Sequence, residues 1–90
     1  MTKEKFDFLF AVQKEELIEN YGTFIRTQLA GDYLCDLYLY DEFYVIFFYL
    51  YNQLHKVNCH CFNSMEEIEL FISSLINIKT DICEVTSIAL

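Results

Sequence analysis

The sequence predicts an α+β fold in which an antiparallel β-meander of about four strands is flanked by an N-terminal and a C-terminal helix. Apolar residues recur at helical spacing near both ends, and runs of β-prone residues separated by short polar breaks fill the middle. Ninety residues fit a single α+β domain spanning 1–90. So short a chain needs a rich core, and 54% hydrophobic and 18% aromatic residues supply one.

An N-terminal helix is expected over residues 3–21. Thr2 is placed to cap its first turn, and Gly22 lies where a residue of left-handed conformation would end its last turn. The alternation Lys5-Phe6-Asp7-Phe8 leaves open a short strand that leads into a shorter helix. The apolar side chains recur at spacings of three, four and seven and line one face: Phe6, Leu9, Phe10, Leu17 and Tyr21.

Four strands are expected between residues 23 and 62, and short polar breaks between them favour antiparallel neighbours. The break Asp41-Glu42 lacks the Gly or Asn that a two-residue hairpin turn prefers, so a longer loop is expected there. In the first strand, period-two alternation sets Phe24, Arg26 and Gln28 against Ile25, Thr27 and Leu29. The expected strands are 23–30, 33–40, 43–51 and 56–62.

A C-terminal helix begins with a capping box formed by Ser64 and Glu67, in which each side chain satisfies a free N–H of the first turn. The helix is expected to end near Asn77, and residues 78–90 form either a short strand or a docked coil. The apolar stripe of this helix, with Phe71 beside it, consists of Met65, Ile68, Ile72, Leu75 and Ile76.

Both helices must bury their apolar faces, and we expect them to lie on one face of the sheet. Residues 44–50 are apolar on both faces of their strand, so a sheet covered on one side only would expose an apolar contact surface. The alternative is that the N- and C-terminal segments cover opposite faces and leave nothing exposed.

The chain carries a net charge of −8 and has a sequence pI of about 4.4. Carboxylates repel phosphate backbones and anionic lipid headgroups, so direct binding to nucleic acid or to a membrane is disfavoured. The acidity suits a basic protein partner, although net charge also serves solubility alone. No stretch has the pattern of a signal peptide or of a spanning helix, so a cytoplasmic location with free thiols is expected.

The run Cys59-His60-Cys61, with His55 upstream, contains residue types that bind zinc. Structural zinc sites space their paired ligands by about two to four residues, whereas a single residue separates these two thiols. On a strand, that spacing sends Cys59 and Cys61 to one face and His60 to the other. Core packing is therefore the favoured interpretation, even though Cys35 and Cys83 would be available to complete a ligand set.

No pattern of residues supports catalysis. Neither a phosphate-binding loop nor a nucleophile motif is present, and two glycines are too few for a phosphate cradle. The carboxylate pairs Glu15-Glu16, Asp41-Glu42 and Glu66-Glu67 lie on polar helix faces or in a turn, where solvated charges are expected. We therefore expect neither an enzyme nor a cofactor or metal.

Tyrosines interleaved with acids in the second and third strands suit a protein interface, because tyrosine has a large apolar body and a polar tip. The leading hypothesis is a non-catalytic protein-binding module, in particular an inhibitor of a basic, nucleic-acid-handling protein. The alternatives are a homo-oligomer, such as a homodimer, joined through the sheet, and a small zinc- or thiol-dependent protein. The expected contact residues are Asp32, Tyr33, Asp36, Tyr38, Tyr40, Asp41, Glu42 and Tyr44.

Overall fold

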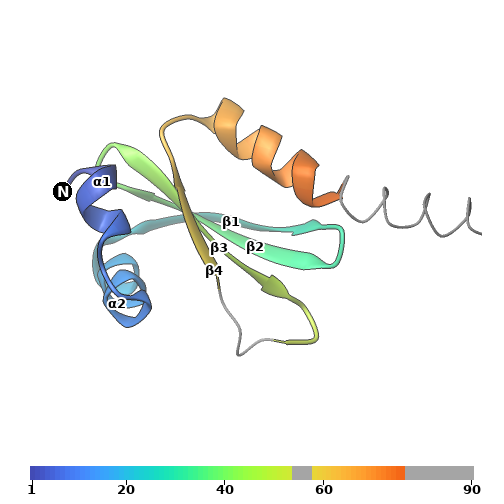
Figure 1. The fold of residues 1–90 in the computed structure, drawn as a ribbon, viewed down its shortest axis with the longest axis horizontal. Coiled ribbons are helices and arrows are strands. Elements are labelled where there is room, and N and C mark those ends of the chain that lie inside the picture. Colours follow the sequence, from blue (N-terminus) through green and yellow to red (C-terminus); the bar gives the residue numbers. More distant parts are fainter. Residues whose placement is uncertain (54–57, 77–90) are drawn as a thin grey trace, which may run out of the picture.

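The computed structural model describes residues 1–53 and 58–76, and it confirms the predicted α+β fold (Figure 1). The order of elements follows the predicted one, with two helices in place of one at the N-terminal end. The C-terminal helix begins at Met65 and is described as far as Ile76. The other elements are α1 (Lys3–Asp7), α2 (Ala11–Tyr21), β1 (Thr23–Ala30), β2 (Tyr33–Tyr40), β3 (Phe43–Leu50) and β4 (Asn58–Phe62).

The four strands form one antiparallel sheet in the order β1-β2-β3-β4, so each strand pairs with its neighbours in sequence. The expectation of a longer loop at Asp41-Glu42 is wrong, because Tyr40 pairs directly with Phe43 across a tight turn. Asp41 adopts a φ of 53°, in the left-handed region that Asp tolerates better than most residues do. Gly31 takes the same first position in the β1–β2 turn, with a φ of 63°.

The prediction of one helix over residues 3–21 is wrong, because the chain breaks between α1 and α2. Phe10 is extended (φ −70°, ψ 156°), and its N–H donates to the Gln13 side chain at 3.0 Å. In a straight helix, Phe6 and Ile18 would point roughly 120° apart, so only one of them could face the sheet. The break lets both side chains enter the core, where they are 0% and 2% exposed.

Gly22 ends α2 without the left-handed conformation that we expected, since its φ is −77° and its ψ is 154°. Its N–H donates to the Ile18 carbonyl oxygen at 2.8 Å. A Cβ atom at this position would lie 2.7 Å from that same oxygen. Glycine is needed here for close approach to the backbone rather than for a positive φ.

The substitution Gly22→Ala is expected to lower the free energy of unfolding by about 1–3 kcal/mol, because the added methyl group meets a backbone oxygen that cannot rotate away. Denaturant titration measures this change. Asn20→Ala on the exposed surface of α2 is the control, with an expected change within about 0.5 kcal/mol. Equal stabilities of the two variants would contradict the close contact.

The helices cover opposite faces of the sheet, so the expectation that they share one face is wrong (Figure 1). Neighbouring residues of β3 alternate between the two cores, and Val45 and Ile46 are both 0% exposed. The core under α1 and α2 contains Phe6, Ile18, Phe43, Val45 and Phe47. The core under the C-terminal helix contains Ala30, Cys35, Leu37, Ile46, Phe48, Ile68, Ile72 and Leu75.

The start of the C-terminal helix confirms the predicted cap in part. The Ser64 hydroxyl accepts from the Glu67 N–H at 3.3 Å. The Glu67 carboxylate accepts from the N–H of Asn63 at 2.8 Å, whereas a capping box would place this bond on the N–H of Ser64. The expected helix end near Asn77, the segment 78–90, and the residues His55 and Cys83 lie outside the described residues.

Candidate functional site

The helices α1 and α2 cover only part of the sheet face on which they pack. Phe6 of α1 packs on the rings of Tyr40 and Phe43, next to the β2–β3 turn. The β1–β2 turn lies at the other end of these strands, away from α1 and α2 (Figure 1). The residues of this face that extend toward that turn form what we name the open sheet patch: Phe24, Thr27, Leu29, Leu34, Asp36, Tyr38 and Tyr49.

Asp36 lies half-buried at the middle of the open sheet patch. The Thr27 hydroxyl donates to its Oδ1 at 2.6 Å, and the Tyr49 hydroxyl donates to its Oδ2 at 3.5 Å. Both donors are neutral, and no cation pairs with this carboxylate among the described residues. The side chain therefore presents a positioned negative charge on the sheet surface.

Tyrosines beside Asp36 are held in their protonated form. The pKa of Tyr49 is raised by burial, then by the charge of Asp36 and its hydrogen bond. Burial also raises the pKa of Tyr38, with smaller contributions from Asp36 and Glu19. A phenol that keeps its proton remains a hydrogen-bond donor, so these hydroxyls support a carboxylate or a partner's carbonyl group.

Apolar side chains surround this carboxylate and are open to solvent. Leu29 is 64% exposed and Phe24 is 55% exposed. The Phe24 ring meets the edge of Tyr38 at a centroid distance of 5.4 Å. Large apolar groups ringing a positioned charge are typical of a contact surface rather than of a solvated sheet.

A β-bulge in β1 assembles part of this patch. The register shifts between Phe24 and Arg26, so Phe24 pairs with Tyr38 whereas Arg26 pairs with Leu37. Phe24 consequently joins the face of Thr27 and Leu29, and the alternation expected from the sequence is wrong at this point. Sequence reasoning also missed Thr27, Leu29 and Leu34, whose only signal was β-propensity, and it left Tyr49 out of the expected contact residues although Tyr49 is one of the third-strand tyrosines that suit an interface.

The residues expected to make contact do not form one surface. Asp36 and Tyr38 lie together in the open sheet patch, and Tyr40 shares their face but packs under Phe6. Tyr33 and Tyr44 point to the opposite face and pack against the core under the C-terminal helix. The exposed acids lie at the two ends of the hairpins: Asp32 in the β1–β2 turn, and Asp41 and Glu42 in the β2–β3 turn.

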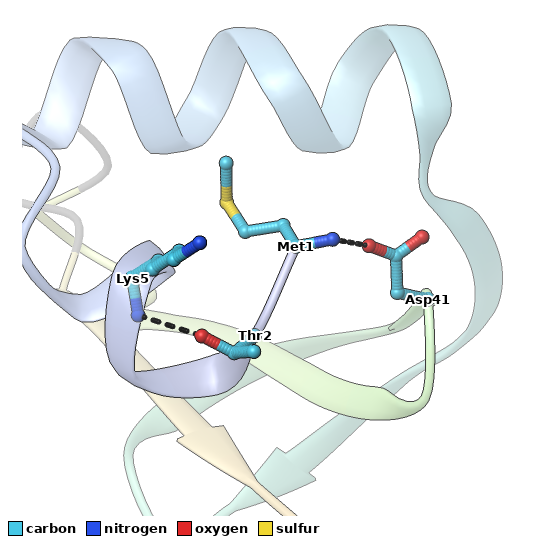
Figure 2. Close-up of polar contacts among 4 residues, drawn as sticks. All are labelled: Met1, Thr2, Lys5 and Asp41. Atoms are coloured by element: carbon cyan, nitrogen blue, oxygen red, sulfur yellow. Dashed lines mark hydrogen bonds and ion pairs between the residues drawn. The ribbon is translucent and has the colours of Figure 1, made fainter.

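Asp41 has an ionic partner within the chain, as Figure 2 shows. The Met1 ammonium group contacts its Oδ2 at 2.5 Å. Thr2 confirms its predicted role, because its hydroxyl accepts from the Lys5 N–H at 3.2 Å and caps α1 (Figure 2). An open pocket of about 620 Å³ lies beside these residues and is also lined by Glu42. The charge of Asp41 is thus compensated, unlike that of Asp36.

The thiol and imidazole groups are divided between the two faces. Cys35 is buried under the C-terminal helix, where burial and the nearby Asp36 raise its pKa to about 11. The predicted alternation in β4 is confirmed, because Cys59 and Cys61 join the core under α1 and α2 while His60 stacks on Phe48 at a centroid distance of 5.5 Å. Across residues 1–53 and 58–76, no three His, Cys, Asp or Glu side chains gather as metal ligands.

No helix among the described residues is long and apolar enough to cross a membrane. In comparisons with known proteins, no family model, no curated protein and no solved structure matches the chain.

Proposed function

We propose that this chain is a non-catalytic protein-binding module that holds a basic segment of a partner protein on the open sheet patch. The observation that carries the proposal is Asp36, a half-buried carboxylate that, among the described residues, bonds only to neutral hydroxyls and lies beside the exposed apolar side chains of Phe24 and Leu29. An arginine or lysine of the partner supplies the missing counter-charge. The surrounding apolar groups exclude water from that ion pair and so strengthen it.

The net charge of the chain supports the same kind of partner. A charge of −8 attracts a basic surface over distance and speeds encounter, while the contact at Asp36 fixes the docked orientation. One specific version is an inhibitor that occupies the basic groove of a nucleic-acid-handling protein. In that version, carboxylates of this chain take the positions that phosphates hold in the nucleic acid.

A charge placed inside the apolar part of the patch tests the proposal. Leu29→Asp is expected to abolish recovery of the partner from an extract of the source organism, because it puts a second carboxylate where apolar contact is needed. Leu70→Asp makes the same chemical change at a residue of the C-terminal helix that is 72% exposed, against 64% for Leu29. Recovery is expected to persist with Leu70→Asp, and equal recovery with both variants would contradict the assigned surface.

One observation favours homodimerisation as a second candidate function. β1 is an edge strand of eight residues, and nearly all of its side chains are exposed. A long exposed edge can pair with the same strand of a second copy, although the bulge in β1 works against regular pairing. Analytical ultracentrifugation separates the two functions: a stable dimer that Leu29→Asp dissociates favours self-association, and a monomer favours a different partner.

A further inference from the structure

Cys59 and Cys61 lie side by side on one face of β4, where they pair with Phe47 and Val45 of β3. Both side chains are half-buried against the core under α1 and α2. Each thiol lies close enough to shift the pKa of the other. Two neighbouring thiols on one face of a strand form a dithiol, an arrangement that core packing alone does not require.

The surroundings of the dithiol shift the pKa values of its two thiols in opposite directions. Its interaction with Cys61 lowers the pKa of Cys59, against the opposing effects of burial, Asp7 and Glu15, and the ammonium group of Lys14 on α2 adds to the lowering. The pKa of Cys61 is raised by its interaction with Cys59, by burial and by Asp7 on α1. Cys59 is therefore the better nucleophile, and Cys61 keeps its proton beside it.

A pocket of about 230 Å³ is lined by Cys59 and gives reagents a place to enter beside it. Its walls come from α2, β3 and β4, and they include the Lys14 side chain that stabilises a thiolate. Cys61 is not part of this lining and lies two residues further along the strand, on the same face. A reagent that enters the pocket therefore meets Cys59 first.

We propose that Cys59 and Cys61 form a reversible thiol–disulfide site that is oxidised by a low-molecular-weight disulfide such as oxidised glutathione. The Cys59 thiolate attacks one sulfur of the reagent, so the reagent's S–S bond breaks and one glutathione thiolate leaves. Cys61 then attacks the Cys59 sulfur of this mixed disulfide and displaces the second glutathione. The pair loses two electrons, one disulfide is reduced to two thiols, and the departing thiolates take up the two protons.

The strand geometry makes the resulting bond easy to reverse. Residues two apart on a strand have Cα atoms roughly 6.6 Å apart, near the upper limit of about 6.8 Å for a disulfide. Among the described residues, β4 pairs with β3 alone, so it can bend locally to close the bond. A bond that bends its strand stores strain and is readily reduced.

Mass spectrometry of the intact protein's tryptic peptides tests the proposal. Cleavage after Lys56 and Lys79 gives the peptide 57–79, which contains Cys59 and Cys61 but neither Cys35 nor Cys83. The folded protein is treated with oxidised glutathione, its remaining thiols are alkylated, and it is then digested. We expect peptide 57–79 to lose two hydrogen atoms and to regain them with dithiothreitol.

Two variants assign the roles within the pair. Cys61→Ser is expected to accumulate one glutathionyl group on Cys59, because no second thiol displaces it. Cys59→Ser is expected to react at least tenfold more slowly, since burial and Asp7 still keep the proton on Cys61 and Cys61 does not line the pocket. Three results would overturn the proposal: full alkylation of both thiols after treatment, a disulfide from either thiol to Cys83, or equal reaction rates of the two variants. Buried Cys35 serves as the unreactive internal reference.

Discussion

Phe6→Ala is expected to lower the free energy of unfolding by about 3–5 kcal/mol, the largest effect of any substitution considered for this chain. The Phe6 side chain is 0% exposed and meets the rings of Tyr40 and Phe43 at centroid distances of 5.9 and 5.6 Å. Its removal leaves a cavity between α1 and the sheet, and it also removes the ring beneath the Lys14 ammonium group. The short helix α1 has no other fully buried side chain to hold it.

Phe8→Ala is the matched control for this prediction. Phe8 is two residues away and is 89% exposed, so the same truncation is expected to change stability by no more than about 0.5 kcal/mol. Denaturant titration of both variants gives the comparison directly. Similar losses from both would contradict the burial of Phe6 between α1 and the sheet, because Phe8 points away from that contact.

Asp36→Asn is expected to weaken binding of the partner about ten- to hundredfold, which is the typical contribution of a hydrogen bond to a charged group. The change keeps the shape of the side chain and removes its charge. The Thr27 hydroxyl can still donate to the amide oxygen, and the Tyr49 hydroxyl can accept from the amide NH2, so the fold is expected to persist. Isothermal titration calorimetry with the recovered partner measures the affinity, and circular dichroism checks the fold.

Glu42→Gln is the control for charge alone. It removes the same single charge, but from the exposed β2–β3 turn at the far end of β2. We expect a small loss of affinity that disappears at high salt, whereas the loss from Asp36→Asn persists because that pair is shielded from solvent. Equal losses with the same salt dependence would show that net charge, and not the patch, attracts the partner.

The strand boundaries were largely predictable because polar breaks interrupt the β-prone runs. β1 and β2 begin and end where the sequence indicates, and Gly31 marks the turn between them. The cap formed by Ser64 at the start of the C-terminal helix was equally predictable, since it depends on two residues that are three positions apart in the sequence. Local chemistry decides these features, so local sequence reveals them.

The arrangement in space was not predictable in the same way. The stretch Phe8-Leu9-Phe10 continues an apolar helical pattern, and only the need to bury both Phe6 and Ile18 against the sheet breaks it. The face that each helix covers depends on packing between distant segments. The bulge in β1 brings Phe24 beside Tyr38, so the open sheet patch appears only once the register is known.

Hydrogen–deuterium exchange of the complex with the recovered partner tests the central claim most directly. If the open sheet patch is the contact surface, peptides from β1 and β2 are expected to exchange more slowly in the complex, while peptides from residues 65–76 exchange as in the free chain. Slower exchange confined to residues 65–76 or to the β2–β3 turn, with β1 and β2 unchanged, would contradict it.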